Sequence, residues 1–192
     1  QERDLLRMSL FKFSILAFAV SFVGITAKAD SISLKEALDR SKYNVFFLRH
    51  ALAPGYGDPP DFNIDDCKTQ RNLNSEGKDQ ATSIGTDLKS IGIPFDKIYS
   101  SEWCRCTETA SLLNLGEVTT FSGLNSFFQN HYNREETLAK LMNQLESLDK
   151  TGRVLMVTHQ VVISAITGIN VASGVAVAYN LSDGSAVKLS MR

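Results

Sequence analysis

Short runs of strand-forming residues alternate with helix-forming segments along most of this chain. Apolar spacing and capping residues predict helices over residues 34–40, 75–90, 103–114, 133–149 and 161–167. Strands are expected at residues 45–48, 97–99, 118–121 and 153–158, followed by a hairpin of 175–181 and 186–189. Strands that alternate with helices favour a parallel sheet with helices on both faces. We therefore expect an α/β fold, a three-layer α/β/α sandwich with a mainly parallel central sheet and an antiparallel edge hairpin.

Residues 1–29 have the pattern of a leader. Met8 is followed by Lys12, by an apolar stretch over 13–25 and then by Ala27-Lys28-Ala29. A basic start, an apolar core of about a dozen residues and an A-x-A site are typical of a secretory signal peptide, and the core is shorter than the ~20 residues of a membrane span. We expect cleavage after Ala29, a single domain over residues 30–192 and a periplasmic or secreted location. A retained anchor is the alternative; after cleavage no stable membrane span is expected.

The charge of the chain bounds its partners. The whole sequence has 20 basic and 21 acidic residues, and the leader holds four of the basic ones (Arg3, Arg7, Lys12, Lys28) and two of the acidic ones (Glu2, Asp4). The remaining chain therefore has a net charge of −3. Nucleic-acid binding proteins usually carry a basic surface. No nucleic-acid partner is expected, and the sequence leaves the oligomeric state open.

Three cysteines occur in the chain, at Cys67, Cys104 and Cys106. Outside the cytoplasm a disulfide is plausible. Cys106 is spaced from Ala110 and Leu113 as on the apolar face of a helix, whereas Cys104 falls on the more polar side. We predict a Cys67–Cys104 disulfide with Cys106 as a buried thiol. Three free thiols are the alternative, because sequence alone does not determine connectivity.

Polar side chains follow three of the expected strands at the point where each strand ends. Arg49 and His50 follow the first, Ser100-Ser101 lead from the second to Arg105, and His159 follows the strand 153–158. In open α/β sheets, ligands bind at the carboxyl ends of the strands, which share one rim. Two arginines can neutralise phosphate oxygens, and a histidine can attack phosphorus. The pattern predicts a phosphate site at this rim.

Four short motifs follow one another over about residues 43–180. They are Leu48-Arg49-His50-Ala51; Leu73, Gly77 and Gln80-Ala81; Ser100, Ser101, Arg105 and Thr109-Ala110; and Val157-Thr158-His159-Gln160. In this order they resemble the Arg-His signature, the following helix, the paired serines with Arg and Thr-Ala, and the late histidine of the histidine phosphatase superfamily, which has the phosphoglycerate mutase-like fold.

The resemblance implies a role for the histidines and arginines of these motifs. His50 would be the nucleophile that becomes phosphohistidine, and Arg49, Arg105 and His159 would complete the phosphate pocket. The implied activity is that of a phosphohydrolase acting on a small phosphomonoester or phosphoramidate, with no metal and no other cofactor. Two rival interpretations stay open: a non-catalytic module that binds phosphate in the same pocket, and a metal site formed by the two histidines and a carboxylate.

The sequence departs from the family where the leaving group is usually protonated. Gln160 stands where one branch has Asp, and residues 124–128 replace the Glu-rich segment of the other branch. Asp58, in the loop after the nucleophile, and Glu102, beside the paired serines, are the candidate proton donors. A phosphoramidate or another good leaving group would need little help from a protein acid.

Overall fold

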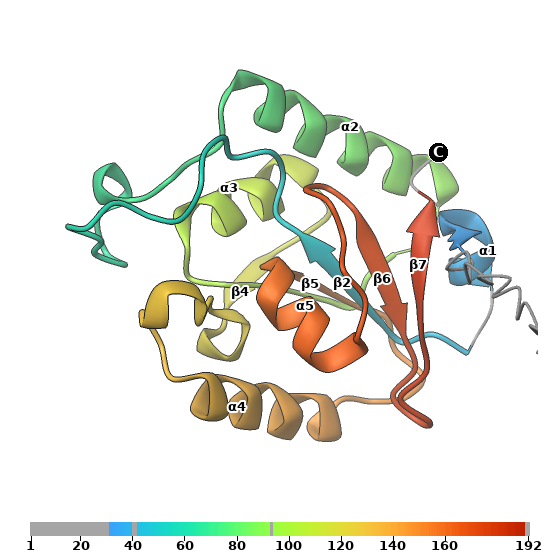
Figure 1. Ribbon diagram of the computed structural model, residues 1–192. Helices are drawn as coiled ribbons and strands as arrows, with labels where there is room; N and C mark the ends of the chain where they lie inside the picture. The colour runs from blue at the N-terminus through green and yellow to red at the C-terminus, as the bar shows by residue number, and fades with distance from the viewer. Residues whose placement is uncertain (1–30, 40–41, 93, 191–192) are drawn as a thin grey trace, which may run out of the picture.

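The strands pair into one sheet in the computed structural model, which describes residues 31–39, 42–92 and 94–190 (Figure 1). Within these residues the sheet has seven strands in the order β1-β7-β6-β2-β5-β3-β4. The strands are β1 (Ser31–Ser33), β2 (Val45–Arg49), β3 (Lys97–Ser100), β4 (Val118–Thr120), β5 (Val154–Thr158), β6 (Ala176–Tyr179) and β7 (Ala186–Ser190). The α-helices are α1 (Leu34–Asp39), α2 (Ser75–Ile91), α3 (Cys104–Leu113), α4 (Arg134–Ser147) and α5 (Gln160–Thr167), and short 3-10 helices span Cys67–Thr69, Ser122–Leu124 and Phe128–Asn130. The expected signal peptide and its cleavage after Ala29 lie outside the described residues, and the predicted single domain over 30–192 stays a prediction.

The two central strands, β2 and β5, form the apolar middle of the sheet. They pair in parallel, and nearly all of their side chains are buried. Successive side chains of β2 point to opposite faces: Phe46 and Leu48 belong to one core, and Val45 and Phe47 belong to the other. A strand that is buried on both faces has a continuous run of apolar residues in the sequence, and this pattern predicted β2.

Helices cover both faces of this sheet. Helices α2 and α3 lie on one side, and α4 and α5 lie on the other (Figure 1). The helices contribute Ile84, Leu88, Cys106, Ala110 and Leu113 to the first core and Leu141, Leu145, Val162 and Ile163 to the second. The three-layer α/β/α arrangement is therefore confirmed, and the helix limits differ from the expected ones by a few residues only.

The antiparallel part of the sheet is made by β6 and β7. Strand β6 runs antiparallel to β2 and β7, whereas the pairs β2–β5, β3–β5, β3–β4 and β1–β7 are parallel. The mainly parallel sheet and the hairpin are confirmed. Strand β1 was not expected: it pairs with β7 and occupies the edge that the hairpin was expected to form. Its three residues are defined by this long-range pairing rather than by a local pattern.

Helix α2 packs closely against the loop that leaves β2. Its N-terminus is capped by Asn74, whose Oδ1 accepts a hydrogen bond from the Gly77 backbone N–H at 2.8 Å. A Cβ atom at Gly77 would lie 2.0 Å from the carbonyl oxygen of Leu52, so only glycine permits this approach. The close contact holds the segment that follows His50 against the helix.

The carboxyl ends of β2, β3 and β5 meet at one rim of the sheet. The backbone N–H of His50 donates to Thr158 O at 2.9 Å, and that of Ser101 donates to Val157 O at 2.9 Å. The hydrogen bonding of the sheet therefore continues past the ends of β2 and β3. This register places the residues after the three strands side by side.

A disulfide joins Cys67 to Cys104, and Cys106 is a buried free thiol. The predicted pairing is confirmed and the alternative of three free thiols is wrong. The bond ties the long loop between β2 and α2 to the first residue of α3. Among the residues described, no helix has both the length and the apolar character needed to cross a membrane.

Candidate active site

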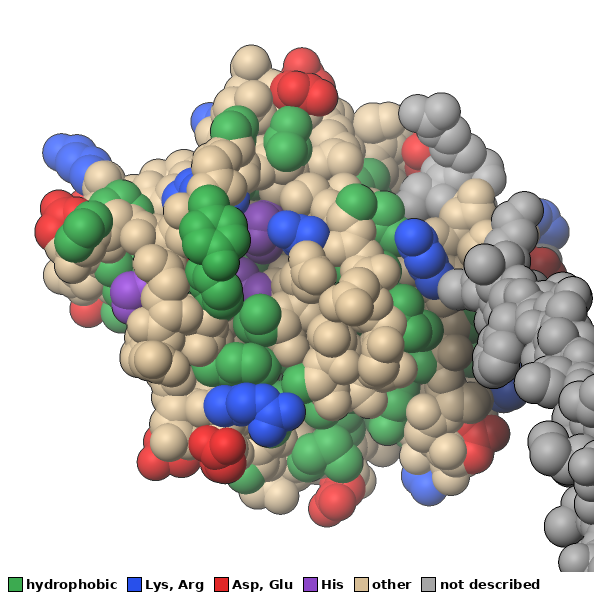
Figure 2. Space-filling model, in the orientation of Figure 1, with side chains coloured by type: hydrophobic (Ala, Val, Ile, Leu, Met, Phe, Trp, Pro, Cys, Tyr) green, Lys and Arg blue, Asp and Glu red, His purple; other side chains and the backbone are tan. Residues whose placement is uncertain are grey.

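A cavity of about 470 Å³ opens at the rim where β2, β3 and β5 end. The arginine and histidine side chains that line it are Arg49, His50, Arg71, Arg105 and His159. Figure 2 shows the hollow, with histidine (purple) at its bottom, a cationic side chain (blue) beside it and hydrophobic side chains (green) along its border. Of the described residues, no aspartate or glutamate lines this cavity. The site is thus built to hold an anion.

His50 presents one ring nitrogen to the cavity as a free base. Its Nδ1 lies 2.7 Å from the carbonyl oxygen of Ala51, which can only accept, so Nδ1 carries the proton and Nε2 keeps its lone pair. Burial, and next the charge of Arg105, lower the pKa of His50 to about 3. The acceptor that holds the tautomer, which the sequence did not identify, is therefore the neighbouring backbone carbonyl. A neutral imidazole in this tautomer is the form that a nucleophile requires.

Arg49 is held at the cavity wall by the residue that departs from the family pattern. Its Nη1 donates to Gln160 Oε1 and to Val171 O, both at 2.8 Å. Its buried Nε has no partner within the described residues. Burial, with a smaller contribution from Arg105, lowers the pKa of the Arg49 guanidinium. Gln160 therefore orients an arginine of the cavity wall with a neutral acceptor.

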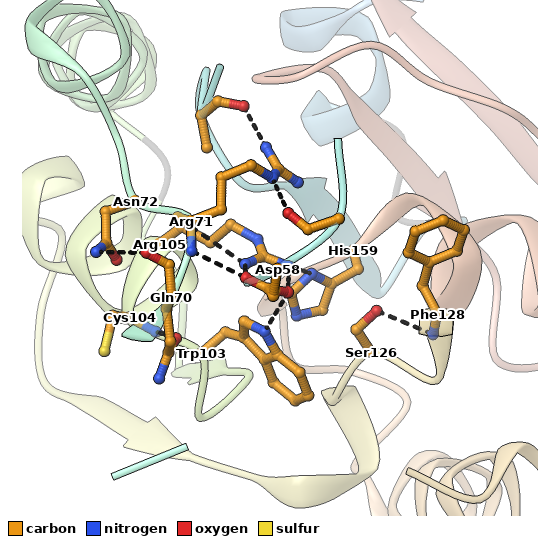
Figure 3. A network of polar contacts seen from close by, with 12 residues as sticks. Asp58, Gln70, Arg71, Asn72, Trp103, Cys104, Arg105, Ser126, Phe128 and His159 are labelled. Atoms are coloured by element: carbon orange, nitrogen blue, oxygen red, sulfur yellow. Dashed lines mark hydrogen bonds and ion pairs between the residues drawn. The ribbon is translucent and has the colours of Figure 1, made fainter. Parts of the chain in front are cut away.

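Arg105 is anchored by a buried carboxylate (Figure 3). Its Nη1 lies 2.7 Å from Asp58 Oδ1 and its Nη2 lies 3.2 Å from Asp58 Oδ2. Asp58 also accepts hydrogen bonds from Trp103 Nε1 at 3.1 Å and from the Arg71 backbone N–H at 3.0 Å. The two-pronged ion pair and two further donors hold both groups in one geometry.

Asp58 and Glu102, the candidate proton donors, do not have the surroundings of a protonated carboxyl group that faces the cavity. Burial raises the pKa of Asp58, but the hydrogen bond and charge of Arg105 outweigh it, so the pKa is lowered and the carboxylate stays ionised. Glu102 Oε2 accepts from Asn125 Nδ2 at 2.5 Å. Neither carboxylate lines the cavity. Their assignment as donors stays a prediction, and their surroundings favour the role of anchors.

His159 is oriented by a chain of side-chain hydrogen bonds. The hydroxyl of Ser101 donates to Asn125 Oδ1 at 3.0 Å and lies 3.0 Å from His159 Nε2. Because that hydroxyl proton is used, Nε2 donates to Ser101 Oγ, which leaves Nδ1 as an acceptor 3.5 Å from Arg105 Nη2. Burial, then the charge of Arg105, lower the pKa of His159 well below its usual value. The rings of His50 and His159 lie 5.5 Å apart between centroids.

Arg71 is a further cationic residue of the cavity that the sequence interpretation did not include. Its Nε donates to Gly57 O at 2.8 Å, and its Nη1 donates to Ala53 O. These bonds fix the guanidinium to the loop and leave it at the cavity wall. Burial, and next Arg105, lower its pKa. Its position two residues before Leu73 of the second motif was the available signal.

The predicted residues thus fall into two groups. Arg49, His50, Arg105 and His159 all line the cavity. Asp58 lies behind the cavity wall, bonded to Arg105 and Arg71, and Glu102 is bonded to Asn125 outside the lining. Within the part of the chain that the structure describes, no group of three or more His, Cys, Asp or Glu side chains is placed to hold a metal ion.

Comparison with known proteins agrees with this geometry. The model of the histidine phosphatase superfamily (branch 1) matches residues 45–137. A broad-specificity phosphatase from Saccharomyces cerevisiae is 46% identical over 41 residues, which are 21% of this chain and 18% of the yeast protein. The chain therefore matches only about a fifth of the length of that relative.

Solved structures share the fold over most of the described domain. The protein histidine phosphatase SixA, complexed with tungstate, aligns with a TM-score of 0.51 and 16% identity over 75% of this chain and 92% of SixA. The α-ribazole phosphatase from Shigella flexneri aligns with a TM-score of 0.55 and 16% identity over 77% of this chain and 96% of the other. The family model matches residues 45–137 and the solved structures share the fold, so the chain is similar to members of the histidine phosphatase superfamily.

Proposed function

We propose that the protein is a metal-independent phosphohydrolase that acts on a small phosphomonoester or phosphoramidate through a phosphohistidine at His50. One observation carries the proposal: His50 Nδ1 is held by the Ala51 carbonyl, so Nε2 faces a cavity lined by guanidinium groups as a free base. The yeast relative is itself named a phosphatase. These features favour nucleophilic attack on a bound phosphoryl group.

The chemistry takes place in two displacements. In the first, the lone pair of His50 Nε2 forms a bond to phosphorus, and the P–O or P–N bond breaks with its electron pair leaving on the departing group. In the second, water attacks phosphorus, the P–Nε2 bond breaks, and inorganic phosphate is released. Arg49, Arg71 and Arg105 neutralise the phosphoryl oxygens in both transition states, and His159 lies beside them.

The substrate class follows from the lack of a facing acid. None of the described residues that line the cavity is a carboxylic acid, so a leaving group must depart without a strong protein donor. Phosphoramidates and phosphomonoesters of acidic alcohols meet this condition. Alkyl phosphates, whose alkoxide is a poor leaving group, are expected to react slowly.

Turnover of 4-nitrophenyl phosphate in the presence of EDTA tests the proposal. Activity that His50→Ala abolishes and that chelation leaves unchanged is the expected result. An acid-labile, base-stable phosphoprotein should be trapped after rapid mixing with labelled substrate, and it should be missing in the His50→Ala protein. Loss of activity with EDTA and recovery with added zinc would contradict the mechanism.

The alternative is a module that binds phosphate without turnover. The cavity without a lining acid is the observation that favours it. Calorimetry with inorganic phosphate separates the two functions: tight binding with no turnover of aryl phosphates or phosphoramidates would favour the module. Binding in either case should weaken in Arg105→Ala.

We also propose that the protein is exported to the periplasm or secreted. The leader pattern before Asp30 and the Cys67–Cys104 disulfide, whose first cysteine is exposed, support this location. Expression of the full chain in a bacterium, followed by cell fractionation and N-terminal sequencing, tests it. A first residue of Asp30 in the periplasmic fraction is expected, and retention of the protein in the cytoplasm would contradict export.

A further inference from the structure

The mouth of the cavity carries an exposed aromatic side chain. Tyr56 is 87% exposed, and among the described residues only Met142, at 40%, is also a large exposed hydrophobic side chain. A single exposed apolar residue is ordinary on a protein surface. Tyr56 is different because its ring contacts that of Phe128, with centroids 5.2 Å apart and planes at 88°, and because both residues line the cavity.

The two rings come from separate segments that are fastened together. Tyr56 lies in the loop after β2, and Phe128 lies in the segment between β4 and α4. Gln129, next to Phe128, accepts a hydrogen bond at its Oε1 from the backbone N–H of Asp58 at 2.7 Å. Gln129 has a φ of 61°, in the left-handed region that a non-glycine residue rarely adopts. Strain of this kind persists where the surrounding structure demands it, often at ligand sites.

In the loop after β2, glycine makes room for the contact with Gln129. Gly57 has a φ of 69°, and a Cβ atom there would lie 2.6 Å from Gln129 Oε1. Gly55, on the other side of Tyr56, has a φ of 99°. The loop therefore turns tightly around Tyr56 and brings its ring beside Phe128. Phe128 and the neighbouring Ser126 lie beside His159 at the site (Figure 3).

The cavity is thus divided by chemistry into two parts. The inner part holds the histidines and arginines, and the outer part is bordered by Tyr56 and Phe128 together with Leu52, Pro54 and Val161. The outer part offers flat apolar surface, and among the described residues it has neither a lysine for a second anionic group nor an acid for the leaving group. Such a surface suits a planar, uncharged ring.

We propose that Tyr56 and Phe128 form a ring-binding subsite and that the substrates are phosphoryl groups carried by a flat aromatic ring, either a phenol oxygen or an imidazole nitrogen. This inference rests on the proposed function, and it adds the class of leaving group. A phenol leaves as phenolate with the electron pair of the P–O bond, and an imidazole that already carries a solvent-derived proton on its other nitrogen leaves as the neutral ring. Neither needs a protein acid at the leaving atom, which matches the cavity without a lining acid. Tyr56 and Phe128 bind the ring and determine specificity, while the arginines bind the phosphoryl group.

Two matched pairs of substrates test the subsite. N-phosphoimidazole and unsubstituted phosphoramidate both break a P–N bond, and 4-nitrophenyl phosphate and acetyl phosphate both have good oxygen leaving groups. Only the first of each pair carries a ring. In the Tyr56→Ala/Phe128→Ala protein we expect KM for the ring substrates to rise roughly three- to tenfold, the effect of a lost aromatic contact. The non-ring substrates should keep their KM.

A matched control variant makes the result specific. Met142→Ala removes the other large exposed hydrophobic side chain of the described residues, from α4, and should leave KM for all four substrates unchanged. Equal losses on ring and non-ring substrates, or no preference for ring substrates in the unaltered protein, would overturn the subsite.

A binding measurement separates failure of the subsite from failure of the proposed function. Phenylphosphonate and methylphosphonate are not hydrolysed, and calorimetry gives their dissociation constants directly. We expect phenylphosphonate to bind more tightly and to lose this advantage in the double variant. No turnover of any substrate, with this preference intact, would refute the phosphohydrolase and retain the ring subsite; equal affinities would refute the subsite even in an active enzyme.

Discussion

The disulfide between Cys67 and Cys104 should contribute a large share of the stability of the domain. It closes a loop with a sequence separation of 37 and ties that loop to the first residue of α3. The loop also bonds to the helix through Gln70, whose Oε1 accepts from the Cys104 backbone N–H at 2.9 Å. Replacing both cysteines by serine removes the cross-link and keeps this hydrogen bond available.

The size of the loop sets the expected loss. In the chain-entropy description, a cross-link that closes a loop of this length removes about 4 kcal/mol of conformational freedom from the unfolded chain at 25 °C. The midpoint of thermal unfolding should therefore fall by roughly 8–16 °C for a domain of this size. The loop carries Asp58 and Arg71, so KM for phosphate substrates should rise as well.

Urea unfolding of the Cys67→Ser/Cys104→Ser protein and of the unaltered protein, each with and without reductant, measures the effect. Reductant should lower the stability of the unaltered protein to that of the variant and leave the variant unchanged. Cys106 is buried and free, so it is present in all samples and serves as an internal control. A loss below about 1 kcal/mol would refute the assignment of this cross-link as a main constraint on the unfolded chain.

Further outcomes follow from single contacts. The pKa of His50 is about 3 in the folded protein, so as pH falls the unfolded chain binds the proton first. The contribution of His50 to stability is therefore full above pH ~6.5, and the free energy of unfolding should decline towards pH 3 by up to about 1.4 kcal/mol per pH unit. Urea titrations of His50→Gln should show a shallower decline. Asp58→Asn should lower kcat/KM on good and poor leaving groups alike, because it releases Arg105, whereas a loss confined to poor leaving groups would mark Asp58 as the proton donor. Ser126→Glu places a carboxyl group at the cavity and should raise turnover of alkyl phosphates by about tenfold or more relative to aryl phosphates; an unchanged ratio would show that the group does not reach the leaving atom.

The fold was largely predictable because its signals are local and repeated. Strands β2 and β5 are continuous apolar runs, and the helices between strands have capping residues such as Asn74 and Asn133, which do cap α2 and α4. Strand β1 was missed for the opposite reason. Its three residues have no pattern of their own, and they form a strand only because β7 lies beside them.

The site was predictable to the extent that parallel strands share a rim. His50, Arg105 and His159 converge because β2, β5 and β3 are neighbours in the sheet, an order that was not predicted from the sequence. Nothing in the sequence indicated the hydrogen-bond acceptor of His50 Nδ1, because this acceptor is the Ala51 carbonyl oxygen and every residue has such a backbone group. The ion pair of Asp58 with Arg105 spans 47 residues, and nothing local in either segment indicates it.

That ion pair lowers the net positive charge of the cavity wall. Arg49, Arg71 and Arg105 all lie at the cavity, and the charge of Arg105 lowers the pKa of both Arg49 and Arg71. Asp58 neutralises one of these charges, and both histidines are kept neutral by burial and by the same arginines. Two positive charges are then left uncompensated, equal in size to the negative charge of a phosphate monoester dianion. Removal of Asp58 would leave an unpaired buried cation, which costs several kcal/mol, so we expect the carboxylate to serve the site by setting its charge.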